Sequence, residues 1–189
     1  MKTARYNEEQ VHQLQSGLIE VRQEVSSEVQ ALLAALAPML DSERAKEYLQ
    51  HGFCRRLHVM SRCVDNIFAL YPPDRVELLE RDARYDLEIS LHAFVSHLVG
   101  ALDNLAWVFV FERSRHKEIR RSDVGIFNKK TQAHMTTALR EYITSPELAA
   151  WWNNYAKKYR DALAHRIPLY VAPSVLLPDD AFAISGAGR

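Results

Sequence analysis

Apolar residues recur at alternating three- and four-residue steps in two long stretches of the chain. The first stretch covers residues 7–37, with apolar positions at Val11, Leu14, Leu18, Val21, Val25, Leu32 and Leu36. The second covers residues 42–70, with apolar positions at Leu49, Phe53, Leu57, Met60, Val64 and Ile67. This spacing places apolar side chains along one face of a helix. Two amphipathic helices are therefore predicted, the second ending before Pro72-Pro73, since proline lacks an amide donor.

Three further helices are predicted, over residues 74–113, 129–143 and 146–165. The segment from Leu87 to Phe111 is apolar on most sides, which is typical of a helix at the centre of a bundle. The sequence Thr144-Ser145-Pro146-Glu147 is a helix start signal, with a hydroxyl cap, a proline in the first turn and an acidic residue three positions after Thr144. Three prolines in 167–178 predict an extended segment that lies across the bundle. We expect residues 171–189 to form an extended tail, disordered at its S-G-A-G-R end.

These elements predict an all-α fold: an antiparallel bundle of four long helices plus a short helix. The length of 189 residues fits a single helical domain over 1–189, whose core covers about residues 40–170. Only six glycines and seven prolines are present, which disfavours a turn-rich β-sandwich.

The formal net charge is zero, so nucleic-acid binding would have to come from a local basic patch. Cys54 and Cys63 lie nine residues apart and therefore on opposite sides of one helix, so we expect reduced thiols. The first ten residues lack the apolar segment of a signal peptide, and no uninterrupted apolar run reaches the roughly 18 residues of a membrane span. We therefore expect a cytoplasmic protein that does not contact a membrane.

The last predicted helix carries a group of charged residues just before Pro168. At about 100° per residue, its predicted core face contains Leu148, Trp152, Tyr155, Tyr159, Ala162 and Leu163. Arg160 lies about 120° to one side of that face and His165 about 100° to the other. The opposite face is small and polar and leaves room for a second backbone; it contains Ala150, Asn153, Asn154, Lys157, Asp161 and Ala164.

Arg160, Asp161 and His165 form the candidate catalytic group. Asp161 and His165 lie four residues apart, so their side chains can meet, and His165 lies in the last helical turn; both features should raise the pKa of His165. The planar Arg160 guanidinium suits phosphate oxygens. This combination can cleave RNA without a metal. Because Arg160 and His165 diverge by about 140° on one helix, we expect a homodimer to bring them together.

Arg160-Asp161-x-x-x-His165 resembles the R-x4–6-H motif of the HEPN superfamily, in which Asn, Asp or His follows the arginine. The resemblance implies an all-α fold and a metal-independent endoribonuclease that acts on RNA as a dimer and leaves 2′,3′-cyclic phosphate ends. It also implies a toxin or defence effector with an antitoxin or other protein partner. Arg44 and His51 match the same spacing, but Ala45 follows that arginine.

Two further groups of residues are candidates for supporting roles. His92, Ser96 and Asp103 lie on one stripe of the central helix and can orient Arg160 or His165; the alternative is an internal hydrogen-bond network. A basic cluster can hold an RNA backbone or can be a solvated loop; it contains Arg113, Arg115, Lys117, Arg120 and Arg121. The histidine spacing predicts no metal site, and no cofactor motif is present.

A second hypothesis is a non-catalytic dimeric helical module that binds a protein partner or RNA. The heptad-like spacing of the N-terminal helix favours it. This hypothesis predicts that the His165 side chain turns inward and forms a hydrogen bond within its own chain.

Overall fold

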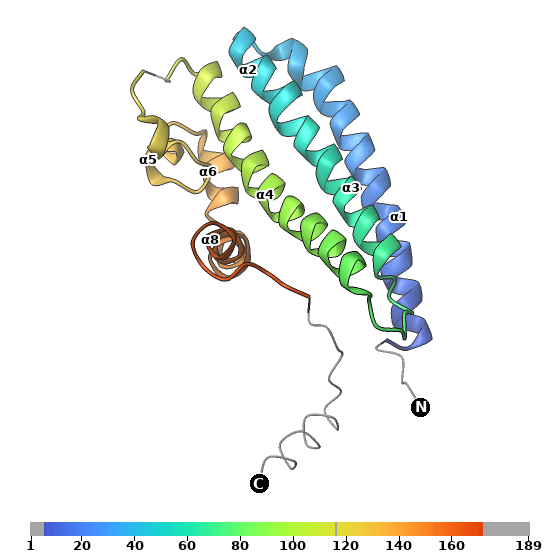
Figure 1. The fold of residues 1–189 in the computed structure, drawn as a ribbon. Helices are drawn as coiled ribbons and strands as arrows, with labels where there is room; N and C mark the ends of the chain where they lie inside the picture. Colours follow the sequence, from blue (N-terminus) through green and yellow to red (C-terminus); the bar gives the residue numbers. More distant parts are fainter. Residues whose placement is uncertain (1–5, 116, 172–189) are drawn as a thin grey trace.

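The computed structural model describes residues 6–115 and 117–171, which form helices and turns without any strand. The prediction of an all-α fold is therefore confirmed. The long helices α1 (Glu8–Ala31), α3 (Arg55–Leu70) and α4 (Arg81–Glu112) lie side by side in Figure 1, with α3 between the other two. The C-terminal helices lie on the other side of α4.

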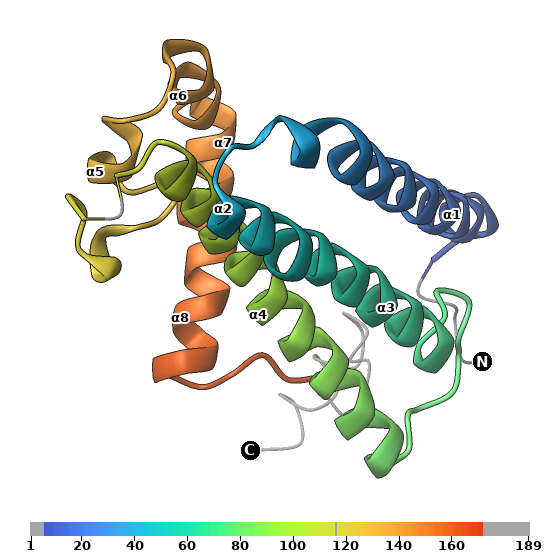
Figure 2. The same ribbon diagram turned by 90° about the horizontal axis from the view of Figure 1, so that it is seen from above.

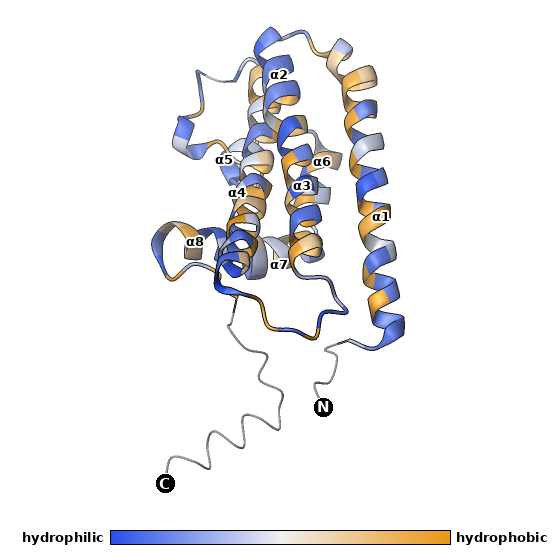
Figure 3. Ribbon diagram, turned by 45° about the vertical axis from the view of Figure 1, so that its right-hand side comes forward, coloured by the Kyte–Doolittle hydropathy of each residue, from blue (hydrophilic) through white to orange (hydrophobic). Residues whose placement is uncertain are grey.

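The first predicted helix is confirmed over most of its length. It begins at the Asn7 cap, whose side chain accepts a hydrogen bond from the Gln10 amide at 2.8 Å, while Gln10 accepts one from the Asn7 amide at 3.0 Å. It continues through the π-turn η1 (Leu32–Leu36) and the 3₁₀ turn η2 (Ala37–Met39). Within α1 only Val29 is buried. Most of α1 is therefore on the surface, and Figure 3 shows hydrophobic and hydrophilic residues alternating along it.

The second predicted helix is built from α2 (Glu43–Glu47), the π-helical segment η3 (Tyr48–Cys54) and α3. The helix predicted from residue 74 begins only at Arg81. The preceding segment stays irregular, and the Arg75 side chain donates hydrogen bonds to the carbonyls of Glu77 and Leu78. These contacts hold the chain in a turn where the sequence predicted helix.

The main core lies between the N-terminal helices and α4. Its buried residues are Val29, Ala37, Leu40, Ala45, Leu49, Cys54 and Val108. A smaller core joins α4 to the loop and helices that follow it, with buried Ala106, Ile126, Met135 and Ile143. This second core fixes the loop that forms one wall of the site described below.

The helix predicted over 129–143 is two short helices, α5 (Lys129–Gln132) and α6 (Thr137–Ile143). Thr136 has extended backbone and caps α6 by accepting a hydrogen bond from the Leu139 amide, which stops one helix from running through. The start signal before the last helix is confirmed with a shift of one residue: Ser145 is the cap and Pro146 the first residue.

The final helix is continuous through α7 (Pro146–Trp151), the π-helical segment η5 (Trp152–Ala156) and α8 (Lys157–His165). It crosses α4, as Figure 2 shows, and α4 contacts both η5 and α8. The extended segment that follows is described up to Val171. The tail predicted beyond that residue lies outside the described part of the chain.

Among the described helices, α4 alone is long and apolar enough to cross a membrane by length and composition. A central bundle helix meets the same criterion, and α4 contacts α2, η3, α3 and α8.

The close approach of η3 to α4 depends on Gly52. A Cβ atom at this position would lie 1.9 Å from Asn104 Nδ2 and 2.8 Å from Asn104 Cγ. We expect Gly52→Ala to lower the free energy of unfolding by about 1–2 kcal/mol, since overpacking outweighs the better helix propensity of alanine. The melting temperature should fall by about 2–8 °C.

Gly17→Ala is the matched control, because nothing lies within 4 Å of a Cβ at Gly17. It should keep or raise the melting temperature. Adding Asn104→Ala to Gly52→Ala should recover much of the loss by removing the overlapping amide. An unchanged melting temperature for Gly52→Ala would show that η3 and α4 do not approach each other this closely.

Candidate functional site

Arg160 lies in α8 and turns toward α4. It lines a cavity of about 430 Å³ whose other lining residues include Asp103, Asn128, Trp152 and Lys157. Arg160 Nη1 lies 3.2 Å from Asp161 Oδ1. Arg160 Nε is buried, and no described residue accepts a hydrogen bond from it. Leaving a buried donor without an acceptor costs about 1–3 kcal/mol, so a ligand oxygen that reached Nε after a movement of the side chain would satisfy it.

The orientation of Arg160 follows from the π-turn in η5. A π-turn bonds residue i to i+5 and so contains more residues per turn than the α-helix assumed for the sequence. Ala156 is consequently buried, at 2% exposure, whereas Tyr155 and Tyr159 are 55% and 40% exposed. The prediction that these two tyrosines lie in the core was wrong. Arg160, predicted to one side of the core face, is half-buried beside α4.

Burial and the charges of two arginines affect the pKa of Asp103. Burial raises the pKa of the Asp103 carboxyl above its ordinary value, and the positive charges of Arg160 and Arg56 act in the opposite direction. Of the predicted stripe His92, Ser96 and Asp103, only Asp103 lines the cavity with Arg160.

Arg56 reaches this position across Gly100. A Cβ at Gly100 would lie 2.5 Å from Arg56 Nη1, so the guanidinium takes this position only beside a residue without a side chain. Arg56 Nη1 lies 3.3 Å from His97 Nδ1, which accepts the hydrogen bond if the ring is neutral. Burial, followed by the charge of Arg56, lowers the pKa of His97. Arg56 of α3 thus interacts with His97 and Asp103 of α4, and Asp103 lines the cavity.

The shifted pKa of Asp103 gives a pH-dependent prediction. Since the folded state raises this pKa, folding favours the protonated carboxyl, and stability is lost as the pH rises through the raised pKa. We expect Asp103→Asn to unfold at a higher temperature than wild type at pH 7. The difference should shrink as the pH falls below about 3.9, where the wild-type carboxyl becomes neutral in both states.

Thermal melts of both proteins at several pH values test this prediction. Asp86→Asn, an exposed Asp-to-Asn change on the same helix, is the control and should show no such dependence. A wild-type protein that is more stable than Asp103→Asn at pH 7 would contradict it.

His165 is the last residue of α8 and is exposed. The predicted contact with Asp161 is absent, since Asp161 pairs with Arg160. Nor does any described residue form an ion pair or hydrogen bond with the His165 ring, so the inward-turned histidine expected for a non-catalytic module is not present either. Within one chain, Arg160 faces the cavity and His165 faces solvent.

His92 has a different role from the one predicted. Its Nε2 lies within hydrogen-bond distance of the Leu169 carbonyl oxygen, and the Val171 amide donates to Glu88 Oε1 at 2.9 Å. These contacts hold the segment after α8 against α4, which agrees with the predicted course of the extended segment across the bundle. Ser96 is exposed and makes no hydrogen bond among the described residues.

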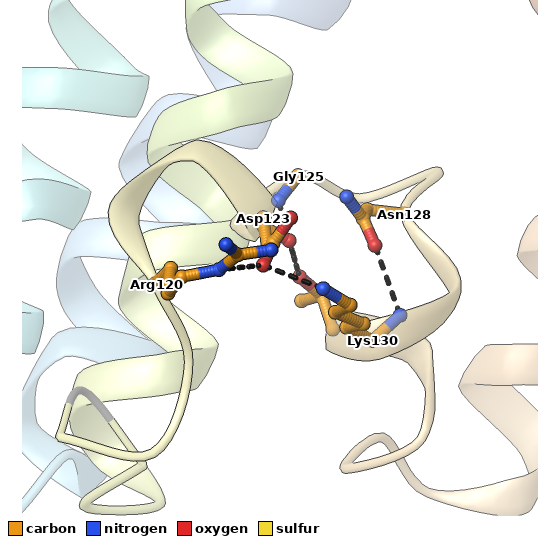
Figure 4. A network of polar contacts seen from close by, with 6 residues as sticks. Arg120, Asp123, Gly125, Asn128 and Lys130 are labelled. Atoms are coloured by element: carbon orange, nitrogen blue, oxygen red, sulfur yellow. Dashed lines mark hydrogen bonds and ion pairs between the residues drawn. The ribbon is translucent and has the colours of Figure 1, made fainter.

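Two of the five residues of the basic cluster, Arg115 and Arg120, pair with acidic neighbours. Arg115 pairs with Glu118 at 2.7 Å. Arg120 and Lys130 pair with Asp123 at 2.9 and 2.7 Å, as Figure 4 shows, and their hydrogen bonds lower the pKa of Asp123. Arg113 lies over the ring of Phe109 at 5.5 Å. Lys117 and Arg121 are exposed and form no ion pair with a described residue.

Polar contacts around Asp123 also fix the loop that forms one wall of the cavity. The Gly125 amide donates to Thr131 Oγ1 at 3.1 Å, and Thr131 Oγ1 donates to the Asp123 carbonyl at 3.0 Å. The Lys130 amide donates to Asn128 Oδ1 at 2.9 Å (Figure 4). This loop was not predicted from the sequence to be part of the site. Its signal was the Asn128 cap, followed by Thr131 within a short helix.

A second cavity, of about 550 Å³, is apolar and lies between α4 and the final helix. Its lining residues are Leu91, Phe94, Val95, Leu98, Trp151, Tyr155, Ala156, Tyr159 and Leu169. The two exposed tyrosines therefore border a groove.

Among residues 6–115 and 117–171, no three His, Cys, Asp or Glu side chains are grouped so that they could hold a metal ion. Cys54 and Cys63 are separate buried thiols whose pKa values are raised by burial. Comparison with family models, curated proteins and solved structures finds no match to the chain.

Proposed function

We propose that this protein is a metal-independent endoribonuclease in which Arg160 holds the phosphate at the cleaved bond and His165 transfers protons. The observation that carries the proposal is the half-buried Arg160 side chain, which lines a cavity and whose buried Nε lacks an acceptor among the described residues. The exposed Lys157, which lines the same cavity, adds a second cation for the RNA backbone.

The chemistry follows from these two side chains. A base removes the proton of the ribose 2′-hydroxyl, and the 2′-oxygen attacks the phosphorus atom. The bond between phosphorus and the 5′-oxygen breaks, and that oxygen receives a proton from an acid. The products are a 2′,3′-cyclic phosphate and a 5′-hydroxyl. A histidine can serve as the acid or the base, and a guanidinium stabilises the charge that grows on the phosphoryl oxygens.

The active form that we propose is a homodimer. Arg160 and His165 of one chain face in different directions, so a second chain is needed to place a His165 near an Arg160. The small polar face of the last helix includes exposed Asn153, Asn154 and Ala164, which leaves it open to a second backbone.

The resemblance of Arg160-Asp161-x-x-x-His165 to the HEPN motif, together with the all-α fold, supports this function. It extends the proposal to a cytoplasmic toxin or defence effector with a protein antitoxin. Exposed Lys117 and Arg121 are the members of the basic cluster with the best access to RNA.

The test is incubation of the purified protein with a single-stranded RNA in the presence of EDTA. We expect cleavage products with 2′,3′-cyclic phosphate and 5′-hydroxyl ends, identified by mass spectrometry. An RNA that stays intact, or products with 5′-phosphate ends, would overturn the proposed chemistry.

A second candidate is a non-catalytic module that binds a protein partner. The apolar groove of about 550 Å³ favours it, as do the exposed apolar residues Leu14, Ile19 and Val21 of α1. This function requires no role for Arg160, so partner binding that survives Arg160→Ala in a protein without nuclease activity would favour it.

A further inference from the structure

The cavity beside Arg160 has the walls of a binding site for a flat ring. Phe127 and Trp152 both line it and stack on each other, with ring centroids 4.4 Å apart and an angle of 14° between the planes. Val99 and Leu102 of α4 add apolar surface. The volume of about 430 Å³ falls within the roughly 300–1,000 Å³ of small-molecule sites. Aromatic and apolar walls of this kind stack unpaired nucleobases.

Polar groups without partners lie on the same cavity. No described residue donates a hydrogen bond to the Asp103 carboxylate, although Asp103 lines the cavity with Asn128. Gly125 leaves the space between them open: a Cβ at Gly125 would lie 3.8 Å from both Asp103 Oδ1 and Asn128 Cβ. Arg160 lines the same cavity. The cavity thus offers a carboxylate acceptor next to two cations, Lys157 and Arg160.

We propose that this cavity binds the guanine base of one unpaired nucleotide in the RNA, with the base against the apolar and aromatic wall and its Watson–Crick edge on Asp103. The inference rests on the proposed function, because it identifies the nucleotide next to the phosphate that Arg160 holds.

Guanine follows from the arrangement of donors on the base. It carries two adjacent donors, N1–H and the N2 amino group, which match the two oxygens of a carboxylate. Cytosine and adenine carry an amino group next to an acceptor nitrogen, and the single N–H of uracil lies between two carbonyl oxygens. Each of these bases would place an acceptor against the Asp103 carboxylate. Asp103 therefore favours guanine by accepting two hydrogen bonds from it, and disfavours the other bases because their acceptor atoms are repelled by the carboxylate.

Calorimetric titration of the full chain with guanosine 5′-monophosphate, uridine 5′-monophosphate and inorganic phosphate tests the site. We expect the guanosine nucleotide to bind at least about 10-fold more tightly than the uridine nucleotide, and Asp103→Asn to weaken its binding by about 10- to 100-fold. Asp86→Asn, an exposed change on the same helix, should leave binding as in wild type. Equal binding of the two nucleotides, or guanosine binding that is unchanged in Asp103→Asn, would overturn the assignment.

Gly125→Ala is the second variant, since its methyl group meets only ordinary contacts and narrows the space beside Asp103. It should weaken guanosine binding without changing phosphate binding; unchanged guanosine binding would count against the site. The results that contradict this inference differ from those that contradict the nuclease proposal. RNA cleavage without any preference for guanine contradicts the guanine site and leaves the nuclease proposal standing. Binding of guanosine 5′-monophosphate by a protein that cleaves no RNA contradicts the nuclease proposal and supports the guanine site.

Discussion

Arg160→Ala is expected to slow cleavage of a single-stranded RNA by about 10²–10³-fold, the cost of removing one group that stabilises charge in the transition state. The guanidinium is half-buried, with its Nε unsatisfied by any described residue, so its charge is directed at a partly desolvated position. Alanine leaves that position without a cation. The measurement is the single-turnover rate constant in EDTA, with enzyme in excess over a labelled RNA.

Arg166→Ala is the matched control, because Arg166 is an exposed arginine directly after α8 that does not line the cavity. It should cleave at nearly the wild-type rate. Thermal melts should show that both variants remain folded. A rate for Arg160→Ala within threefold of wild type would remove Arg160 from the reaction.

His165→Ala is expected to lower the same rate constant by about 10²–10⁴-fold, the contribution of a general acid or base. His165 is exposed at the end of α8 and makes no ion pair among the described residues, so its replacement should not disturb the fold. The pH dependence of the rate that a proton-transferring side chain contributes should be present in wild type and lost from the residual activity of the variant.

The control for this variant is His12→Ala, a change at an exposed histidine in α1. It should retain both the rate and the pH profile of wild type. Residual activity of His165→Ala that keeps the wild-type pH profile would assign proton transfer to another residue.

The sequence predicted the helices well where the apolar spacing is regular and a start or stop signal is strong. Ser145 and Pro146 start the last helix, and Pro72-Pro73 follows the end of α3. Residues 74–80 and 133–136 were wrongly predicted as helix, since side-chain contacts such as those of Arg75 and the cap at Thr136 act locally against it.

The site was predicted only in part. Arg160 and Asp103 line one cavity, whereas His92 and Ser96, predicted on the same stripe as Asp103, do not line it. The π-turn in η5 was not visible in the sequence, because no residue motif in Trp152–Ala156 signals its wider spacing. For the same reason Tyr155 and Tyr159 were placed in the core. The pairing of Arg120 and Lys130 with Asp123 was missed because the loop brings the three side chains together.

The central claim is that two chains share one reaction centre. Arg160→Ala and His165→Ala proteins, each nearly inactive alone, are unfolded together and refolded as a mixture. If an Arg160 from one chain works with a His165 from the other, mixed dimers regain an intact pair and about a quarter to a half of the wild-type cleavage rate returns. A mixture as inactive as its separate components, with mixed dimers demonstrated by mass spectrometry, would contradict the shared site.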